Sequence, residues 1–318
     1  HDALPISDLN IITGTIPSVT GFNEFAPLME RNKSQVVASG IAGSNSTLGN
    51  EIVASILYDK ASISLGQFHY ETNGFRPNSQ QNQNVYNAFM QYSVTPKLNV
   101  QAEFRAQDGS HGDVSLNFSR EGNFNYHRNL NESVARFGAR YSLSPNQDLI
   151  FSGKYIDRKV VLSGSEPSNL SGLHFETQHL FRQKYFNSVM GGGSYDFDPK
   201  FKRNNYYIYT NTHLPWNVTV TAGVSYEVFF SSVKNHQTRI NPKFGFQWDV
   251  TDKLRLRGAW FETTKADLIA QQSLEPTQIA GFNQFMDDFN GTRSRRMGIG
   301  ADYRFSDAVL SGVEADRK

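Results

Sequence analysis

The stretch Tyr92-Ser93-Val94-Thr95-Pro96 recurs along the chain with the same order of residue types. Its pattern is an aromatic residue, any residue, an apolar residue, a small polar residue, and then Pro or Asp. Side chains two positions apart lie on one face of a strand, and Thr, Ser, Asp and Pro favour tight turns. The pattern therefore predicts a strand, a turn and a second strand at each copy. The other copies are Tyr141–Pro145, Trp248–Asp252 and Tyr303–Asp307.

Two classes of protein repeat an aromatic residue just inside a turn. A membrane barrel places such residues at the boundary between lipid and water, and a soluble all-β protein can have Tyr-rich strand ends. The strand after the first turn alternates strictly, with one apolar and one polar face. Its apolar residues are Leu98, Val100, Ala102 and Phe104, and its polar residues are Asn99, Gln101, Glu103 and Arg105.

Composition excludes several classes. The 318 residues carry 31 basic and 30 acidic side chains with no basic stripe, so nucleic acid is not an expected partner. No apolar run approaches the eighteen or so residues of a transmembrane helix. The mean hydropathy of −0.50 still fits a membrane barrel, because lumen-facing residues and loops are polar. The chain has no cysteine, which excludes disulfides and thiolate sites.

The pattern predicts an all-β fold, an antiparallel up-and-down transmembrane β-barrel with about 14 to 16 strands visible. Strands of about ten residues suit a tilted bilayer crossing, and short turns alternate with long polar loops. Tyr195-Asp-Phe-Asp-Pro199 matches the turn pattern but falls on the long-loop side, so it predicts either a shifted strand or an accidental match. The expected strands are 34–43, 51–59, 60–71, 84–95, 97–107, 133–143, 148–158, 173–184, 187–197, 204–213, 216–230, 239–250, 253–264, 293–305 and 308 onward.

Two segments are expected: an irregular lead-in over 1–33 and the barrel over 34–318. Bacterial barrels have an even number of strands, so an odd count near fifteen predicts further strands beyond Lys318. The ending Ala-Asp-Arg-Lys also lacks the terminal aromatic residue of many assembled barrels.

Charged residues alternate with the apolar ones on several strands. In a soluble barrel these charges would fill the core, where unpaired charge is costly. In a membrane barrel the two faces are exchanged: the apolar residues face lipid, and the charged residues line a water-filled lumen. The arginines could select an anionic solute, since charged rings set selectivity in pores, but charge balance with lumen carboxylates is the favoured role. The lumen-lining candidates are Glu103, Arg105, Arg136, Arg140, Glu227, Arg255, Arg257, Asp302 and Arg304.

The insertion from Lys265 to Thr292 is the best functional candidate, since loops of this length are usually functional or disordered. Its aromatic residues predict that it folds inward or packs on other loops. Its carboxylates could bind a hard cation, although they lack the spacing of a calcium loop. No metal, cofactor or enzymatic site is expected, because no nucleophile elbow or phosphate loop is present. The external-loop candidates are Phe282, Phe285, Asp287, Asp288 and Phe289.

Several segments resemble one bacterial family. They include Leu254–Trp260, Ser273–Thr292, Gly21-Phe22-Asn23-Glu24-Phe25 and Leu65–Glu71. The resemblance is to large outer-membrane proteins labelled TonB-dependent-receptor-like, in which a tetratricopeptide-repeat region precedes a barrel. It implies location in the bacterial outer membrane, contact with its lipid, and a periplasmic repeat region of the same polypeptide as partner. Neither repeat helices nor a globular plug is visible in this sequence.

The first functional hypothesis is a pore or transport module, an export conduit coupled to upstream periplasmic repeats. The first alternative is a TonB-dependent-type importer whose plug is absent from this chain. The second alternative is a structural or adhesive platform without transport. The sequence names no solute.

Overall fold

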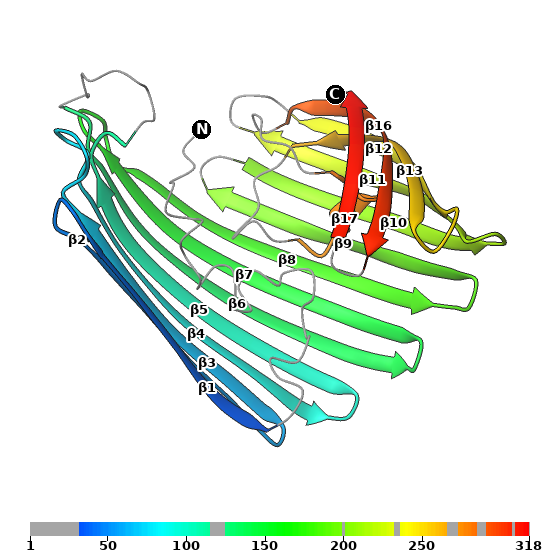
Figure 1. Ribbon diagram of the computed structural model, residues 1–318, viewed down its shortest axis with the longest axis horizontal. Coiled ribbons are helices and arrows are strands. Elements are labelled where there is room, and N and C mark those ends of the chain that lie inside the picture. The colour runs from blue at the N-terminus through cyan, green and yellow to red at the C-terminus, as the bar shows by residue number, and fades with distance from the viewer. Residues whose placement is uncertain are drawn as a thin grey trace. The chain divides into compact units, whose positions relative to one another are not determined.

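The structure is a computed structural model that describes residues 32–114, 125–198, 201–231, 236–265, 273–284, 291–306 and 309–317. Fifteen strands form one antiparallel up-and-down sheet in chain order, and β14 and β15 form a separate hairpin. Figure 1 shows the strands from β1 in blue to β17 in red. The bounds are β1 Lys33–Gly43, β2 Thr47–Tyr58, β3 Ala61–Thr72, β4 Gln81–Thr95, β5 Leu98–His111, β6 Arg128–Ser144, β7 Gln147–Leu162, β8 Ser168–Arg182, β9 Phe186–Asp198, β10 Phe201–Leu214, β11 Val218–Ser231, β12 Gln237–Asp249, β13 Leu254–Thr264, β14 Gln278–Ile279, β15 Phe282–Asn283, β16 Arg293–Ser306 and β17 Val309–Arg317.

The all-β fold class and the strand count expected from the sequence are confirmed. Most strands extend a few residues beyond the expected bounds, and the expected start at residue 216 moves to Val218. Trp216 and Asn217 instead form the turn before β11, with φ angles of 64° and 60°. Two successive positive φ angles give the turn that best matches the twist of a hairpin.

Two of the recurring turns, at Thr95 and Thr251, use the same local hydrogen bonds. The Thr95 hydroxyl accepts the backbone N–H groups of Lys97 and Leu98 at 3.2 and 3.0 Å. Thr251 accepts the N–H groups of Lys253 and Leu254 at the same distances. The small polar residue of the pattern thus satisfies two donors that the strand end leaves open.

The Tyr195–Pro199 match has a different meaning. β9 ends at Asp198 and β10 begins at Phe201, so these strands follow each other more closely than β7 and β8 or β11 and β12 do. Tyr195 is 1% exposed and stacks on His174 at 3.7 Å between ring centroids. It is therefore an interior residue, and the likeness to the boundary aromatics is accidental. The corresponding aromatics Tyr92, Tyr141, Trp248 and Tyr303 are 38–44% exposed.

Along the strands, apolar side chains on the exposed face alternate with polar side chains on the buried face. In β8, Leu173 and Phe175 are 46% and 47% exposed, while His174 and Glu176 between them are each 1% exposed. Large apolar side chains on the outside and ionisable ones inside are the reverse of a soluble protein. This arrangement is stable where the outer face meets hydrocarbon.

The chain divides into two compact units. The first comprises residues 1–140, 152–173 and 197–199, and the second comprises residues 141–151, 174–196 and 200–318. The first unit has a small apolar cluster of Val53, Phe68 and Val85. The larger cluster of the second unit joins β10 and β13 to the β14–β15 hairpin and is made of Tyr207, Tyr209, Phe261, Ile279 and Phe282.

No helix long and apolar enough to cross a membrane occurs among the residues that the structure describes.

The outward apolar face gives a first prediction. Leu65 lies near the middle of β3 and is 55% exposed, whereas Tyr58 lies at the turn that precedes it. Replacing Leu65→Arg should lower the free energy of unfolding in lipid vesicles by about 2–4 kcal/mol, because a charge at mid-bilayer depth loses hydration. Tyr58→Arg, near the interface, should cost about 0–1 kcal/mol. Guanidinium unfolding followed by tryptophan fluorescence measures both, and equal effects would contradict a lipid-facing β3.

Candidate functional site

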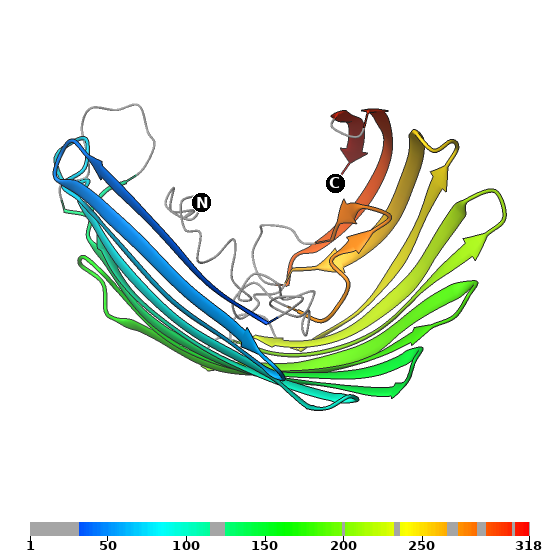
Figure 2. The ribbon, with the colours of Figure 1, turned by 60° about the horizontal axis from the view of Figure 1, so that its bottom comes forward.

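The candidate site lies in the second unit, where residues 273–284 pack on the polar face of β8 to β13. Figure 2 shows the β14–β15 hairpin, in orange, on one face of these strands. The hairpin turns at Ala280 and Gly281, which both have positive φ angles of 49° and 87°. The Gln284 N–H donates to the Thr277 carbonyl at 2.8 Å and extends the pairing by one step. We call residues 273–284 the inserted segment.

Glycines in the strands make room for the apolar side chains of the inserted segment. A Cβ atom at Gly245 would lie 2.8 Å from both Ile279 Cγ2 and Ala280 Cβ, and a Cβ at Gly298 would overlap the Phe282 ring. Ile279 and Phe282 are consequently 0% and 1% exposed. Burying two such side chains contributes about 1.5–3 kcal/mol each. Glycine in a strand marks close approach of another chain segment, and that is its role here.

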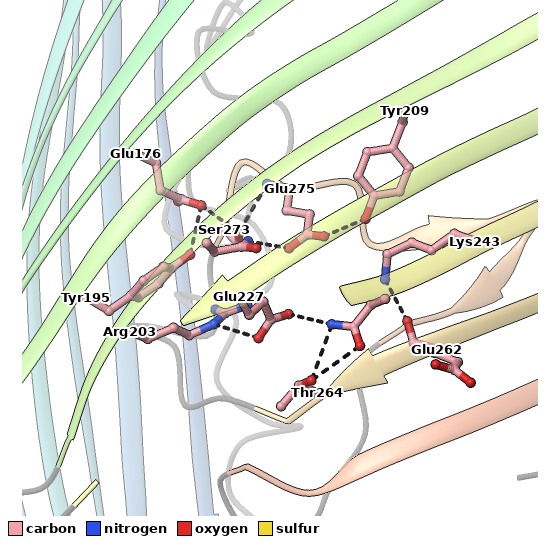
Figure 3. A network of polar contacts seen from close by, with 12 residues as sticks. Glu176, Tyr195, Arg203, Tyr209, Glu227, Lys243, Glu262, Thr264, Ser273 and Glu275 are labelled. Atoms are coloured by element: carbon pink, nitrogen blue, oxygen red, sulfur yellow. Dashed lines mark hydrogen bonds and ion pairs between the residues drawn. The ribbon is translucent and has the colours of Figure 1, made fainter. Parts of the chain in front are cut away.

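Glu176 of β8 anchors the beginning of the inserted segment. Its carboxylate accepts the Ser273 hydroxyl at 2.7 Å, the Leu274 N–H at 3.0 Å and the Tyr195 hydroxyl at 3.0 Å. Figure 3 shows these groups converging on one carboxylate. Gln178, two residues further along β8, donates to the Leu274 carbonyl. Hydrogen bonds to an ionised group are about twice as strong as neutral ones, so Glu176 is the main polar anchor.

Glu275 anchors the segment a second time. Its carboxylate accepts Asn205 Nδ2 at 2.7 Å and the Tyr209 hydroxyl, both from β10. The Glu275 N–H donates to the Ser273 hydroxyl at 3.1 Å, which fixes a local turn. Gln284 closes the segment on itself by donating to the Pro276 carbonyl at 2.7 Å.

A second buried chain of polar contacts runs beside the first. Arg203 Nε donates to Glu227 at 3.2 Å, and Asn241 Nδ2 donates to the other oxygen of Glu227 at 3.1 Å. The Arg203 guanidinium also lies 4.9 Å from the centre of the Tyr195 ring. Lys243 donates to the Glu262 carbonyl oxygen at 3.0 Å. These contacts satisfy charged groups that would be costly to bury alone, as Figure 3 shows.

The arrangement is suited to binding by hydrogen bonds and aromatic contact. Among the residues that the structure describes, no three His, Asp or Glu side chains gather as metal ligands. The site can offer carboxylate acceptors, amide and phenol donors, and a recessed apolar floor.

The family model described as TonB dependent receptor-like, beta-barrel matches residues 34–312, most of the chain. The chain belongs to this family. It is a family of transporters of the bacterial outer membrane, so the polar face of the sheet is the lumen side and the apolar face meets lipid. Enzymatic activity is not a property of the family, and the outer-membrane location predicted from the sequence is confirmed. The repeat region that the resemblance implied stays a prediction.

Solved structures of this fold are similar over most of the chain. The copper transporter OprC has a TM-score of 0.67 at 10% identity, with coverage of 87% of this chain and 52% of OprC. The FrpB iron transporter from Neisseria meningitidis has a TM-score of 0.65 at 12% identity, with 91% and 55% coverage. The ferric yersiniabactin uptake receptor FyuA from Yersinia pestis has a TM-score of 0.66 at 10% identity, with 91% and 54% coverage.

The chain thus spans about half the length of these transporters. At such identities the likeness shows the fold alone. A comparison with curated protein sequences gave no match.

The lumen-lining candidates of the first unit lie in close ion pairs. Arg136 contacts Glu103 at 2.7 Å, and both side chains are buried. Asn87 donates to the same carboxylate at 2.7 Å. Arg105 and Arg140 are half-buried in neighbouring strands. The geometry favours charge balance within the lumen over a ring of free arginines.

The candidates of the second unit fall into two groups. Glu227 belongs to the buried chain described above, and Arg257 is paired with Asp302 at 3.0 Å and Glu314 at 2.9 Å. Arg255 pairs with Asp249 near the β12–β13 turn and is exposed, as is Arg304. A role of these residues in solute selection stays a prediction.

Of the external-loop candidates, only Phe282 lies among the residues that the structure describes. Phe282 packs against the sheet, with Arg257 4.7 Å from its ring centre. Phe285, Asp287, Asp288 and Phe289 lie outside the described residues, and so do the carboxylates that were considered as cation ligands.

Sequence reasoning did not single out Glu176, Gln178, Asn205 or Tyr209. Each of them lies on the polar face of its strand, as many other residues do. The alternation of apolar and polar residues therefore does not distinguish them. The usable signal was Gly245 and Gly298, because glycine inside a strand of alternating pattern indicates close approach of another segment.

The glycine recess gives a second prediction. Gly245→Val should displace the hairpin, since a side chain there overlaps Ile279 and Ala280. In this cysteine-free chain, an Ala280→Cys reporter should react slowly with a maleimide and at least tenfold faster after Gly245→Val. Gly40→Val is the matched control, because a Cβ at Gly40 meets only one atom, at 3.7 Å. Unchanged reactivity in the Gly245 variant would mean that the hairpin is not seated there.

The buried ion pair gives a third prediction. Glu227→Leu leaves Arg203 charged and almost fully buried, and should cost about 3–5 kcal/mol of unfolding free energy. The double variant Arg203→Met with Glu227→Leu removes both charges and should recover most of that loss. Guanidinium unfolding in vesicles measures the difference. A double variant as unstable as the single one would show that the Arg203 charge is not the cause.

Proposed function

We propose that this chain is the barrel part of an energised outer-membrane transporter that takes up a solute. Three functions were open from the sequence: export conduit, importer and platform. The comparisons favour import over export, because FyuA is described as an uptake receptor and OprC and FrpB as transporters. Coupling to an upstream periplasmic repeat region is a further proposal that rests on the sequence resemblance alone.

The observation that carries the proposal is the covered lumen face of the second unit. Glu176, Asn205 and Asn241 are at most 1% exposed. In a permanently open pore such groups would be hydrated, since water is their best partner. Here the inserted segment and neighbouring side chains replace that water. Passage along this face therefore requires a part to move, which fits a gated transporter better than a diffusion pore.

The contacts that hold the inserted segment also suggest that transport requires energy. The inserted segment is held by carboxylate hydrogen bonds at two places and by two buried apolar side chains. Contacts of this kind sum to several kcal/mol. A transport cycle that breaks and re-forms them needs either solute binding energy or an external source. An importer of this family would draw on the proton-motive force of the inner membrane.

The fourth prediction tests direction and energy together. Cells expressing the full-length protein are grown beside vector-only cells, with and without a protonophore, and their media are compared by mass spectrometry. At least one solute should be depleted only in expressing cells, and the protonophore should abolish the difference. Depletion that persists with the protonophore would indicate a passive pore. Accumulation of a solute in the medium would overturn the proposal in favour of export.

A further inference from the structure

We propose that Glu176, Gln178, Asn205 and Tyr209 form a binding site for a short peptide with a carboxylate side chain. In this structure Ser273-Leu274-Glu275 of the same chain occupies the site and takes the place of that ligand. The inference names a solute class for the proposed uptake and rests on that proposal.

The first part of the site, Glu176 and Gln178, binds the backbone of a peptide. The Glu176 carboxylate accepts the Leu274 N–H at 3.0 Å, and Gln178 donates to the carbonyl of the same residue. Both side chains come from the lumen face of β8, two residues apart. The N–H and C=O groups of one residue are therefore both recognised, and neither contact depends on the Leu274 side chain. Any peptide that adopts the same local bend can offer the same pair.

The second part of the site, Asn205 and Tyr209, binds a carboxylate one residue further along the bound chain. Asn205 and Tyr209, four residues apart on β10, donate to the two oxygens of Glu275. A carboxylate accepts both bonds with the donors as they stand, whereas the nitrogen of an amide would require Asn205 to turn its oxygen inward or Tyr209 to accept instead of donate. The site therefore favours Glu over Gln at this position.

Unused hydrogen-bonding capacity remains in the floor of the site. Asn205 Oδ1 and Ser225 Oγ have no hydrogen-bond partner among the described residues, although both side chains are 0% exposed. A buried polar group without a partner costs about 1–3 kcal/mol. Asn205 uses its amide nitrogen on Glu275, so its oxygen can accept a donor that the inserted segment does not supply. A ligand with one more N–H group would bind better than the segment does.

The apolar anchors of the inserted segment come after residues 273–275 and meet the carboxylate subsite at Tyr209. Ile279 and Phe282 sit in the recesses at Gly245 and Gly298 and pack in one cluster with Tyr209, whereas Glu275 uses the hydroxyl of that residue. Residues 273–275 can therefore leave Asn205 and Tyr209 while the hairpin stays seated. This separation allows the two ends of the segment to be tested independently.

The tethered residues 273–275 and a free peptide compete for the same site, and this competition sets the affinity expected for the peptide. A tethered segment has an effective concentration on the order of millimolar, so a free peptide with the same contacts competes poorly against it. Removing the Glu275 side chain leaves the carboxylate subsite empty and should raise the affinity for a free acidic peptide.

The fifth prediction uses the full-length protein in detergent micelles and a fluorescein-labelled hexapeptide, Ser-Leu-Glu-Pro-Thr-Gln, copied from residues 273–278. Fluorescence polarisation should show at least tenfold tighter binding to the Glu275→Ala variant than to the unaltered protein. Adding Tyr209→Phe to Glu275→Ala should remove most of this gain. Asp249→Ala is the matched control, because it removes an exposed carboxylate that pairs with Arg255 instead, and it should give no gain.

A second peptide with Ala in place of Glu tests the carboxylate directly, and should bind the Glu275→Ala variant at least tenfold more weakly than the acidic peptide. Should that variant fail to fold, Glu275→Gln keeps the volume of the side chain and removes its charge, and it should still raise the affinity for the acidic peptide, by less than Glu275→Ala does. Equal binding of the two peptides, or no gain over the unaltered protein, would overturn the inference and leave the inserted segment a purely structural element.

The two proposals fail separately. Acidic peptide that binds as expected but is not depleted by energised cells would leave the binding site standing and reject peptide uptake. Energised depletion of some other solute, without peptide binding to the Glu275→Ala variant, would support the uptake function and reject this site.

Discussion

The solvent on each side of the sheet is the constraint on which the rest of the structure depends. Hydrocarbon offers no hydrogen bonds, so a chain that crosses it must pair its backbone internally and turn apolar side chains outward. Leu173 and Phe175 are half exposed while Glu176 beside them is buried, and only a lipid surrounding makes that order favourable. Each strand then has one face free for polar chemistry.

Polar residues on the inner face need partners, and the structure supplies them in two ways. In the first unit, Arg136, Glu103 and Asn87 satisfy one another across neighbouring strands. In the second unit, part of the need is met by the inserted segment, whose Ser273, Leu274 and Glu275 bond to β8 and β10. The same side chains that make the lumen face polar are thereby available to recognise a chain that lies on it.

The family and the inserted segment bear on function at different levels. Membership in a family of outer-membrane transporters fixes the class of protein. The inserted segment adds what is particular to this chain: a covered lumen face, and a carboxylate and peptide group held by Glu176, Gln178, Asn205 and Tyr209. The recesses at Gly245 and Gly298 explain why the segment lies where it does, since the nearest side-chain atoms at both glycines belong to Ile279, Ala280 and Phe282.

The sequence alone determined the strands, their order and their two faces, because alternation and turn residues act over a few neighbouring positions. The Thr95 and Thr251 turns show this: the residue type and the bonds it makes lie within three positions of each other. Tyr195 shows the limit, since the same local pattern occurs at a residue whose surroundings are interior. Only the tertiary structure brought Glu275 to Asn205, seventy residues away. Such a contact depends on how a long insertion packs on strands distant in sequence, and on recesses left by two glycines, and no local pattern encodes either.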